Sequence, residues 1–276
     1  MATKKPTVDG AKKGPGPKAR SLARAYDGFK FPPKLYVSSS PSNSASPDDA
    51  VDSVDTFDWR ALVTVRRSGD QGKCNACSSF AIASAIEIYW SKSHQNESIN
   101  VAPGFIHTCL GHGESSDPIV VCTFGVDLYA ALRLVRTKGY LTGPGAPYPF
   151  PPNACPTTGV SGVISDFAEV STPQGAKSAL ANVGPIVADM YIWQDFFEYS
   201  SSSGQAYVPD LARKGPYPHS VCVIGFDAQG WIVKNSYGAQ WGDGSGCGTI
   251  AYGSCALLGA TPPSGQVQRQ AFTLSL

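Results

Sequence analysis

The chain lacks an excess of charge of either sign, and it lacks a long apolar run. Its 276 residues include 22 Lys and Arg against 21 Asp and Glu, a formal net charge of +1 at pH 7. No stretch approaches the ~18 apolar residues expected of a membrane-spanning helix. A balanced charge also provides no basic surface of the kind that binds nucleic acid. For the body of the protein we therefore expect neither a nucleic-acid partner nor a membrane partner.

Two further absences concern export and metal binding. The N-terminal residues are basic but have no apolar core of the kind found in a secretory signal peptide, so no cleavable signal is visible. There are only four histidines. No second Cys-x-x-Cys and no His-x3–5-His pattern accompanies the pair Cys74 and Cys77, so a four-ligand zinc site lacks its second half. We expect no metal.

Cysteine, by contrast, is abundant. Eight cysteines are many for a reducing compartment, and this number favours a secreted or extracytoplasmic location. Cys222 lies in an apolar run and is the best candidate for a buried free thiol. Cys247 and Cys255 could pair with each other only if the chain bends, because eight residues of straight strand separate them too far for a disulfide. The alternative is that all the cysteines are reduced.

The most informative stretch is QGKCNACSSF, residues 71–80. It leads into an Ala-rich apolar run at 80–90 without Pro or Gly, which predicts a largely buried helix. Cys77 would then lie at or near a helix N-terminus, where unpaired backbone N–H groups and the helix dipole favour a thiolate. The stretch therefore predicts a nucleophilic cysteine. A redox pair and a structural pair are the alternatives for the Cys-x-x-Cys motif.

A nucleophilic thiol needs a base, a group that orients the base, and an oxyanion donor. His219 opens the strand-like run HSVCVIGF, and Asn235 ends the next run, WIVKN. The tight turn at 227–230 joins the two runs into an antiparallel hairpin, whose open end would bring His219 and Asn235 together. Gln71, six positions before Cys77, can present a side-chain amide beside the sulfur.

From about residue 57 to the C-terminus the chain resembles the papain family of cysteine peptidases. The order Cys, His, Asn is that of the family, and the spacing from Cys77 to His219 lies within its usual ~130–150 positions. Ser78 and Tyr237 depart from the family pattern, which has Trp at both places. The matching blocks are Asp58-Trp59-Arg60, Gln71-Gly72-x-Cys74-x-x-Cys77, His219 with its apolar strand, and Lys234-Asn235-Ser236-Tyr237-Gly238-x-x-Trp241-Gly242.

The resemblance implies an α+β, papain-like fold of two lobes, one helical and one an antiparallel barrel-like sheet, with the active site in the cleft between them. We expect the peptidase domain at 57–276, divided into a helical lobe at about 57–158 and a β-rich lobe at about 159–276. Residues 1–56 form a basic, Pro/Ser-rich extension. This extension is either a mobile or targeting tail, or a short pro-region whose aromatic segment 26–37 docks on the body near the cleft.

The pattern of apolar and turn residues also predicts individual elements. A short aromatic turn is expected at 193–199. Helices are expected at 80–90, 101–110, 126–137 and 173–182. Strands are expected at 58–65, 162–170, 186–192, 219–226, 231–235, 248–252 and 270–274.

The resemblance also implies catalytic roles. Cys77 would attack the peptide carbonyl, and His219 would hold its thiolate as an ion pair and then protonate the leaving amine. The Asn235 side-chain oxygen would fix the tautomer and rotation of the imidazole. Gln71 and the backbone N–H of Cys77 would stabilise the oxyanion.

Substrate contacts and disulfides are implied in the same way. The backbone of Gly125 would pair with an extended substrate as an added strand. Asp127 would favour a basic substrate side chain if it points inward. Tyr237 and Trp241 would cover the hydrogen bond between His219 and Asn235. The remaining implied contacts are Phe124, Val126 and Pro218, and the implied disulfides are Cys74–Cys122 and Cys109–Cys155.

These roles together imply a cysteine endopeptidase that forms an acyl-enzyme thioester on extended peptide or protein substrates. We expect a monomer that needs no cofactor. One alternative is a catalytically silent protein with the same fold that binds peptides, suggested by Ser78 and Tyr237. The other is an acyltransferase or amidase that uses the same three residues.

Overall fold

The computed structural model describes residues 55–113, 117–143, 148, 155–156, 160–201 and 204–276. The expected extension, 1–56, lies outside these residues except for its last two positions. Its aromatic segment lies outside them as well.

The described part of the chain is built around a seven-stranded antiparallel sheet. The strand order is β2-β7-β3-β4-β5-β6, and the short strand β1 pairs with β4. Strands β2 and β6 are the two edges of this order and do not pair with each other. The sheet that we expected to be barrel-like is therefore open. The strands are β1 (Phe57–Asp58), β2 (Asp166–Glu169), β3 (Ile186–Ile192), β4 (Tyr217–Phe226), β5 (Gly230–Lys234), β6 (Cys247–Ala251) and β7 (Ala271–Ser275).

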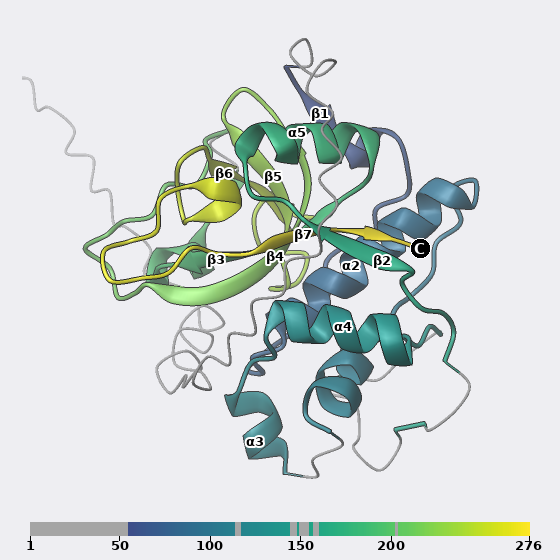
Figure 1. Ribbon diagram of the computed structural model, residues 1–276. Helices are drawn as coiled ribbons and strands as arrows, with labels where there is room; N and C mark the ends of the chain where they lie inside the picture. Colours follow the sequence, from purple (N-terminus) through teal and green to yellow (C-terminus); the bar gives the residue numbers. More distant parts are fainter. Residues whose placement is uncertain (1–54, 114–116, 144–147, 149–154, 157–159, 202–203) are drawn as a thin grey trace, which may run out of the picture.

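Helices cover both faces of the sheet. The longest, α2 (Cys77–Ser93), is buried on nearly all sides and packs against the face of the sheet that carries Val187 and Cys222. Helix α5 (Pro173–Asn182) packs on the opposite face, with Ala188 and Val223. In Figure 1 α5 lies at the top of the view and α3 and α4 lie at the bottom. The remaining helices are α3 (Pro118–Thr123), α4 (Leu128–Lys138) and the π-helical turn η2 (Phe105–Gly111). Shorter 3-10 turns are η1 (Trp59–Ala61), η4 (Gln194–Glu198) and η6 (Leu257–Gly259).

Helix α5 and strand β3 have the expected bounds, because their signals are local. Thr172 accepts a hydrogen bond from Gly175 N, and Pro173 occupies the first helical position, two standard features of a helix start. Strand β3 is an uninterrupted run that is buried except at Asp189. Helix α4 starts two residues later than expected, at Leu128, where Asp127 caps it, and Gly139 ends it with φ +87°.

The strand expected at 58–65 is wrong. Strand β1 ends at Asp58, whose carboxylate accepts hydrogen bonds from the backbone and side chain of Arg60 and starts a 3-10 turn. The turn places Trp59 in the core with an exposed fraction of 4%. The strand expected at 162–170 is also too long, because only residues 166–169 pair with β7. The helix expected at 101–110 begins at Phe105.

Candidate active site

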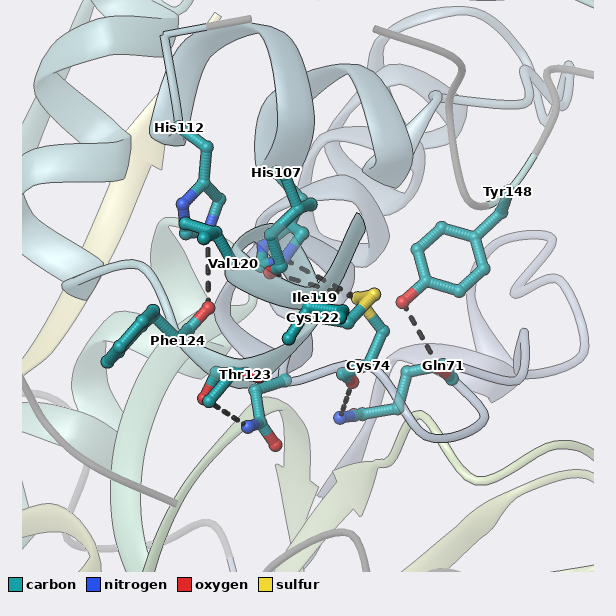
Figure 2. Close-up of a disulfide and its surroundings, with 12 residues drawn as sticks. Gln71, Cys74, His107, His112, Ile119, Val120, Cys122, Thr123, Phe124 and Tyr148 are labelled. Atoms are coloured by element: carbon teal, nitrogen blue, oxygen red, sulfur yellow. Dashed lines mark hydrogen bonds between the residues drawn. A yellow bond between two sulfur atoms is a disulfide. The ribbon is translucent and has the colours of Figure 1, made fainter. Parts of the chain in front are cut away.

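Helix α2 starts at Cys77, and the turn before it is tied to α3. Cys74 forms a disulfide with Cys122, and the side chain of Asn75 donates to the carbonyl of Thr123 at 2.8 Å (Figure 2). Ser78, at the second position of the helix, donates to the carbonyl of Val126 at 2.8 Å. The thiol of Cys77 is therefore held at the beginning of a buried helix, beside the segment 124–127.

Four of the eight cysteines form the two expected disulfides. Cys74 pairs with Cys122 and Cys109 with Cys155, and Cys222 is a buried free thiol as expected. Cys247 and Cys255, whose pairing the sequence left open, are both free. Cys247 belongs to the core on the α2 face of the sheet and Cys255 to the core on the α5 face, so the sheet lies between them. The two disulfides are consistent with a compartment outside the reducing cytosol.

The β4–β5 hairpin brings His219 and Asn235 together. The His219 Nε2 lies 2.8 Å from the Asn235 Oδ1, and both side chains are buried. The same oxygen accepts a hydrogen bond from the backbone N–H of Ser236. An amide oxygen only accepts hydrogen bonds, so Nε2 carries the proton and the lone pair of the ring lies on Nδ1.

An aromatic cluster surrounds this imidazole. The Tyr237 hydroxyl lies 3.4 Å from the Nδ1 of His219, and the two rings are 5.0 Å apart between centroids. Phe196, in turn η4, packs edge-on against His219 at 5.7 Å. Trp241 lies one layer further back, where it contacts Phe196 and Tyr237 and donates its indole N–H to the Phe196 carbonyl. The sequence indicated an aromatic turn at 193–199 but did not single out Phe196.

The sulfur of Cys77 lies against strand β4. Its Sγ is 3.8 Å from the Oγ of Ser220, the residue that directly follows His219. Ser220 Oγ in turn donates to Asp189 Oδ1 at 2.6 Å, and the two residues face each other across the β3–β4 pair. The sequence analysis missed Ser220 and Asp189. A signal was present, because Asp189 is the one charged residue in the apolar run IVADMYI.

Burial has a strong effect on the ionisation of both groups. Loss of hydration, and to a smaller extent the neighbouring charge of Asp189, raise the pKa of the Cys77 thiol to about 11, although the hydrogen bond with Ser220 opposes this shift. Loss of hydration also lowers the pKa of His219 to about 4, although the Asn235 hydrogen bond opposes this shift. Both directions favour the neutral thiol and the neutral imidazole when each group is considered by itself, and the ion pair between them stays a prediction.

A family model described as papain family cysteine protease matches residues 53–258 of the chain. The chain belongs to the papain family. Relatives include a cathepsin L-like peptidase of Aedes aegypti, 28% identical over 68% of this chain and 56% of its own length. Rat procathepsin L is 27% identical over 68% of this chain and 57% of its own length. The chain thus spans less than two thirds of the length of these relatives.

Solved structures of similar fold agree with this assignment. The digestive procathepsin L 3 of Tenebrio molitor superposes with a TM-score of 0.64 at 20% identity, over 84% of this chain and 72% of its own. A Carica candamarcensis cysteine protease, solved in complex with E-64, superposes with a TM-score of 0.59 at 18% identity, over 80% of this chain and 98% of its own. The expected papain-like α+β fold is thereby confirmed.

Gln71, the predicted oxyanion donor, is buried and fixed at both ends of its amide. Nε2 donates to the Cys74 carbonyl at 2.8 Å, and Oε1 accepts from the hydroxyl of Ser236, which follows Asn235. The Tyr148 hydroxyl donates to the backbone carbonyl of Gln71 at 3.1 Å, as Figure 2 shows. Because an amide nitrogen carries two protons, one N–H of Gln71 is not used in the bond to Cys74.

The segment 124–127, which the sequence analysis predicts to contact substrate, is partly exposed. Phe124, Gly125 and Val126 are half-buried, and the carbonyl of Phe124 contacts the His112 Nε2 at 3.1 Å. Asp127 uses its Oδ1 to cap α4, accepting from the backbone N–H of Ala130. Pro218, also half-buried, lies in β4 opposite Tyr191 of β3.

No cluster that could hold a metal was found among the described residues: no three His, Cys, Asp or Glu side chains gather at one point. Within the same residues, every helix is too short or too polar to cross a membrane.

Proposed function

We propose that this protein is a cysteine endopeptidase that hydrolyses extended peptides, with Cys77 as nucleophile, His219 as acid and base, and Asn235 as the residue that orients His219. One observation carries the proposal. His219 of β4, whose Nε2 lies 2.8 Å from the Asn235 Oδ1, directly precedes Ser220, whose hydroxyl lies 3.8 Å from the sulfur of Cys77. Membership of the papain family supports the same reaction class.

The proposed reaction begins with a proton transfer. Since burial favours the neutral form of each group by itself, the Cys77 proton moves to the Nδ1 of His219 as the sulfur attacks the substrate carbonyl. The S–C bond forms and the carbonyl oxygen becomes an oxyanion. The backbone N–H of Cys77 and the second amide N–H of Gln71 donate to that oxygen. His219 then gives its proton to the leaving amine, and water releases the acyl group from sulfur.

Asn235 supports this cycle through the tautomer of His219. Because the Asn235 side-chain oxygen accepts a hydrogen bond from Nε2–H, the lone pair of the imidazole is fixed on Nδ1. Nδ1 is the nitrogen that has to accept the thiol proton. The Asn235→Ala variant should keep the nucleophile but lose the orientation of the base. Turnover should fall while alkylation of Cys77 by iodoacetamide at high pH continues.

The test is labelling by an epoxysuccinyl peptide inhibitor followed by mass mapping, together with turnover of a fluorogenic dipeptide. We expect the adduct on Cys77, and we expect Cys77→Ala to abolish turnover while the protein stays folded. Cys222→Ala, which changes another free thiol in a buried strand, is the control and should keep turnover. An adduct elsewhere, or turnover by Cys77→Ala, would exclude the mechanism.

A second function has one specific observation in its favour. The Tyr237 hydroxyl at 3.4 Å from Nδ1 occupies the nitrogen that has to accept the thiol proton. A catalytically silent peptide-binding protein would tolerate that contact. It would bind the dipeptide without cleaving it, and Cys77 would react with the inhibitor no faster than an ordinary buried thiol.

A further inference from the structure

Strand β3 contains a carboxylate where the rest of the strand is apolar. Its other six residues are buried, whereas Asp189 is half-buried. On β3, Val187 packs on the face of the sheet that α2 covers, and Ala188 on the opposite face. Side chains alternate along a strand, so Asp189 lies on the face of Val187, the side from which Cys77 approaches.

The contacts of Asp189 lead directly to the proposed nucleophile. Ser220 donates to Oδ1 at 2.6 Å, and the oxygen of the same hydroxyl lies 3.8 Å from the sulfur of Cys77. Among the described residues, Ser220 is the one donor to this carboxylate. The second oxygen, Oδ2, therefore keeps its capacity to accept a hydrogen bond from a bound molecule.

Charges of both signs surround Asp189. The guanidinium of Arg269 lies over the ring of Tyr191 at 3.9 Å, and its positive charge lowers the pKa of Asp189 against the larger effect of burial. A second carboxylate, Asp127 at the start of α4, is close enough to raise the pKa of Asp189. Burial favours the neutral forms of the proposed base His219 and nucleophile Cys77.

A carboxylate at this position works against the proposed chemistry, because its charge raises the pKa of the Cys77 thiol. A residue that only served catalysis would stabilise the thiolate. A charged residue inside an otherwise apolar, buried strand departs from the usual pattern, and such departures occur mainly at functional sites. The charge of Asp189 is therefore better suited to binding a cation than to activating the thiol.

We propose that Asp189 is a specificity-determining residue that binds a Lys or Arg side chain of the substrate next to Cys77, an inference that rests on the proposed function. Ser220 holds Oδ1 in place and leaves Oδ2 for the cation. The substrate side chain would lie between the segment 124–127 and strands β3 and β4. Binding of the cation would also offset the effect of Asp189 on the thiol, so a basic substrate would favour its own attack.

The test uses peptide binding, which does not depend on turnover. Cys77→Ala protein is titrated with two matched series of short peptides that carry Arg, or its neutral isostere citrulline, at either of the two residues before the expected cut. At pH 7.5 we expect the Arg peptide to bind about tenfold more tightly at one of the two positions. Asp189→Asn in the same background should remove this preference.

Asp166→Asn is the matched control, because it removes the same charge from an exposed position that pairs with Arg136 on strand β2. This variant should keep the preference for Arg. If Asp189→Asn does not fold, the pH dependence of the unsubstituted site decides. Burial raises the pKa of Asp189 to about 6, so the preference should disappear when the pH falls from 7.5 to 5.

Equal binding of the Arg and citrulline peptides at pH 7.5, or a preference that persists in Asp189→Asn, overturns the inference. A preference for Arg without cleavage of any peptide by the intact protein would reject the proposed function and leave Asp189 as a recognition residue. Cleavage without any preference for Arg would support the proposed function and reject the role of Asp189 in specificity. The two proposals therefore fail separately.

Discussion

At the scale of single residues, Tyr237 has the clearest consequence for reactivity. Its hydroxyl can donate to the Nδ1 lone pair of His219 across 3.4 Å, because Nε2 is already the donor to Asn235. A hydrogen bond donated to a neutral imidazole stabilises that form and disfavours protonation. Tyr237 and Cys77 therefore compete for the same lone pair.

Removal of this hydroxyl should make the site faster. In Tyr237→Phe the ring remains in the aromatic cluster while the competing donor is lost. A neutral hydrogen bond contributes about 0.5–1.5 kcal/mol, so kcat/KM should rise by about two- to tenfold. The measurement is turnover of a fluorogenic dipeptide together with the rate of Cys77 alkylation.

The matched control is Tyr199→Phe. Tyr199 belongs to the same cluster, with its ring 5.3 Å from that of Trp241, but its hydroxyl donates to backbone carbonyls at residues 205 and 249. This variant should leave kcat/KM unchanged. A fall in activity of Tyr237→Phe would show that the hydroxyl assists the reaction.

At the scale of elements, a buried ion pair joins the helix of Cys77 to the strand that ends before Asn235. Lys234 of β5 donates to Ser84 of α2 at 2.8 Å and lies 3.6 Å from the Glu87 carboxylate. Glu87 also accepts from the backbone N–H of Val101. The side chains of Lys234 and Glu87 are 3% and 11% exposed. This pair helps to fix the position of the proposed nucleophile relative to Asn235.

Breaking this pair on one side should be costly. Lys234→Met leaves the Glu87 carboxylate without its cation, and such an uncompensated buried charge costs about 3–5 kcal/mol in the free energy of unfolding. The double variant Lys234→Met/Glu87→Gln should recover part of the loss. Denaturant unfolding measures both. Arg136→Met, which breaks an exposed pair with Asp166, should cost at most about 1 kcal/mol. Equal losses for the buried and the exposed pair would contradict this account.

At the scale of the whole molecule, buried histidines connect folding to pH. His107 lies behind the Cys74–Cys122 disulfide, with its Nε2 2.8 Å from the Val121 carbonyl (Figure 2). Burial and the nearby His112 lower the pKa of His107 to about 4, and burial lowers the pKa of His219 to about 4. Burial also lowers the pKa of His112. His107 and His219 are therefore neutral in the folded protein at pH values well below the usual histidine pKa.

These shifts predict that acid destabilises the fold. The unfolded chain binds protons at histidine near pH 6.5 and the folded chain only near pH 4, so stability is full above pH 6.5 and falls as the pH drops toward 4. Asp189 acts in the opposite direction, because its raised pKa of about 6 lets the folded state take up a proton first. The lowered pKa values of two histidines affect stability more than the raised pKa of one carboxyl, so we expect a net loss of folding stability in acid.

The measurement is the Tm between pH 7.5 and 4.5. His107→Asn removes one titrating group and keeps an amide that can donate to the Val121 carbonyl, so its Tm should fall less steeply over the same range. A Tm that rises toward pH 4.5, or a His107→Asn curve as steep as that of the unsubstituted protein, would show that other groups govern acid stability.

Local chemistry in the sequence was enough to predict many parts of this protein. The cap and proline at 172–173 determine where α5 starts, and the apolar run 186–192 determines β3. The tight turn at 227–230 determines the hairpin that brings His219 to Asn235. The motif blocks indicated the papain family, and this resemblance implied the two disulfides. All of these depend on residues close together in the chain or on a pattern of motifs in a fixed order.

Tertiary packing decided the rest, because the position of a side chain in space depends on strand register and on which face of a sheet is covered. Register across β3 and β4 places Asp189 opposite Ser220, whose hydroxyl contacts the sulfur of Cys77. The sheet separates Cys247 from Cys255, which the spacing alone allowed to pair. The burial of Trp59 turned an expected strand into a 3-10 turn. The sequence determined which chemical groups the protein has, and only the packed sheet decided that a carboxylate lies beside the thiol.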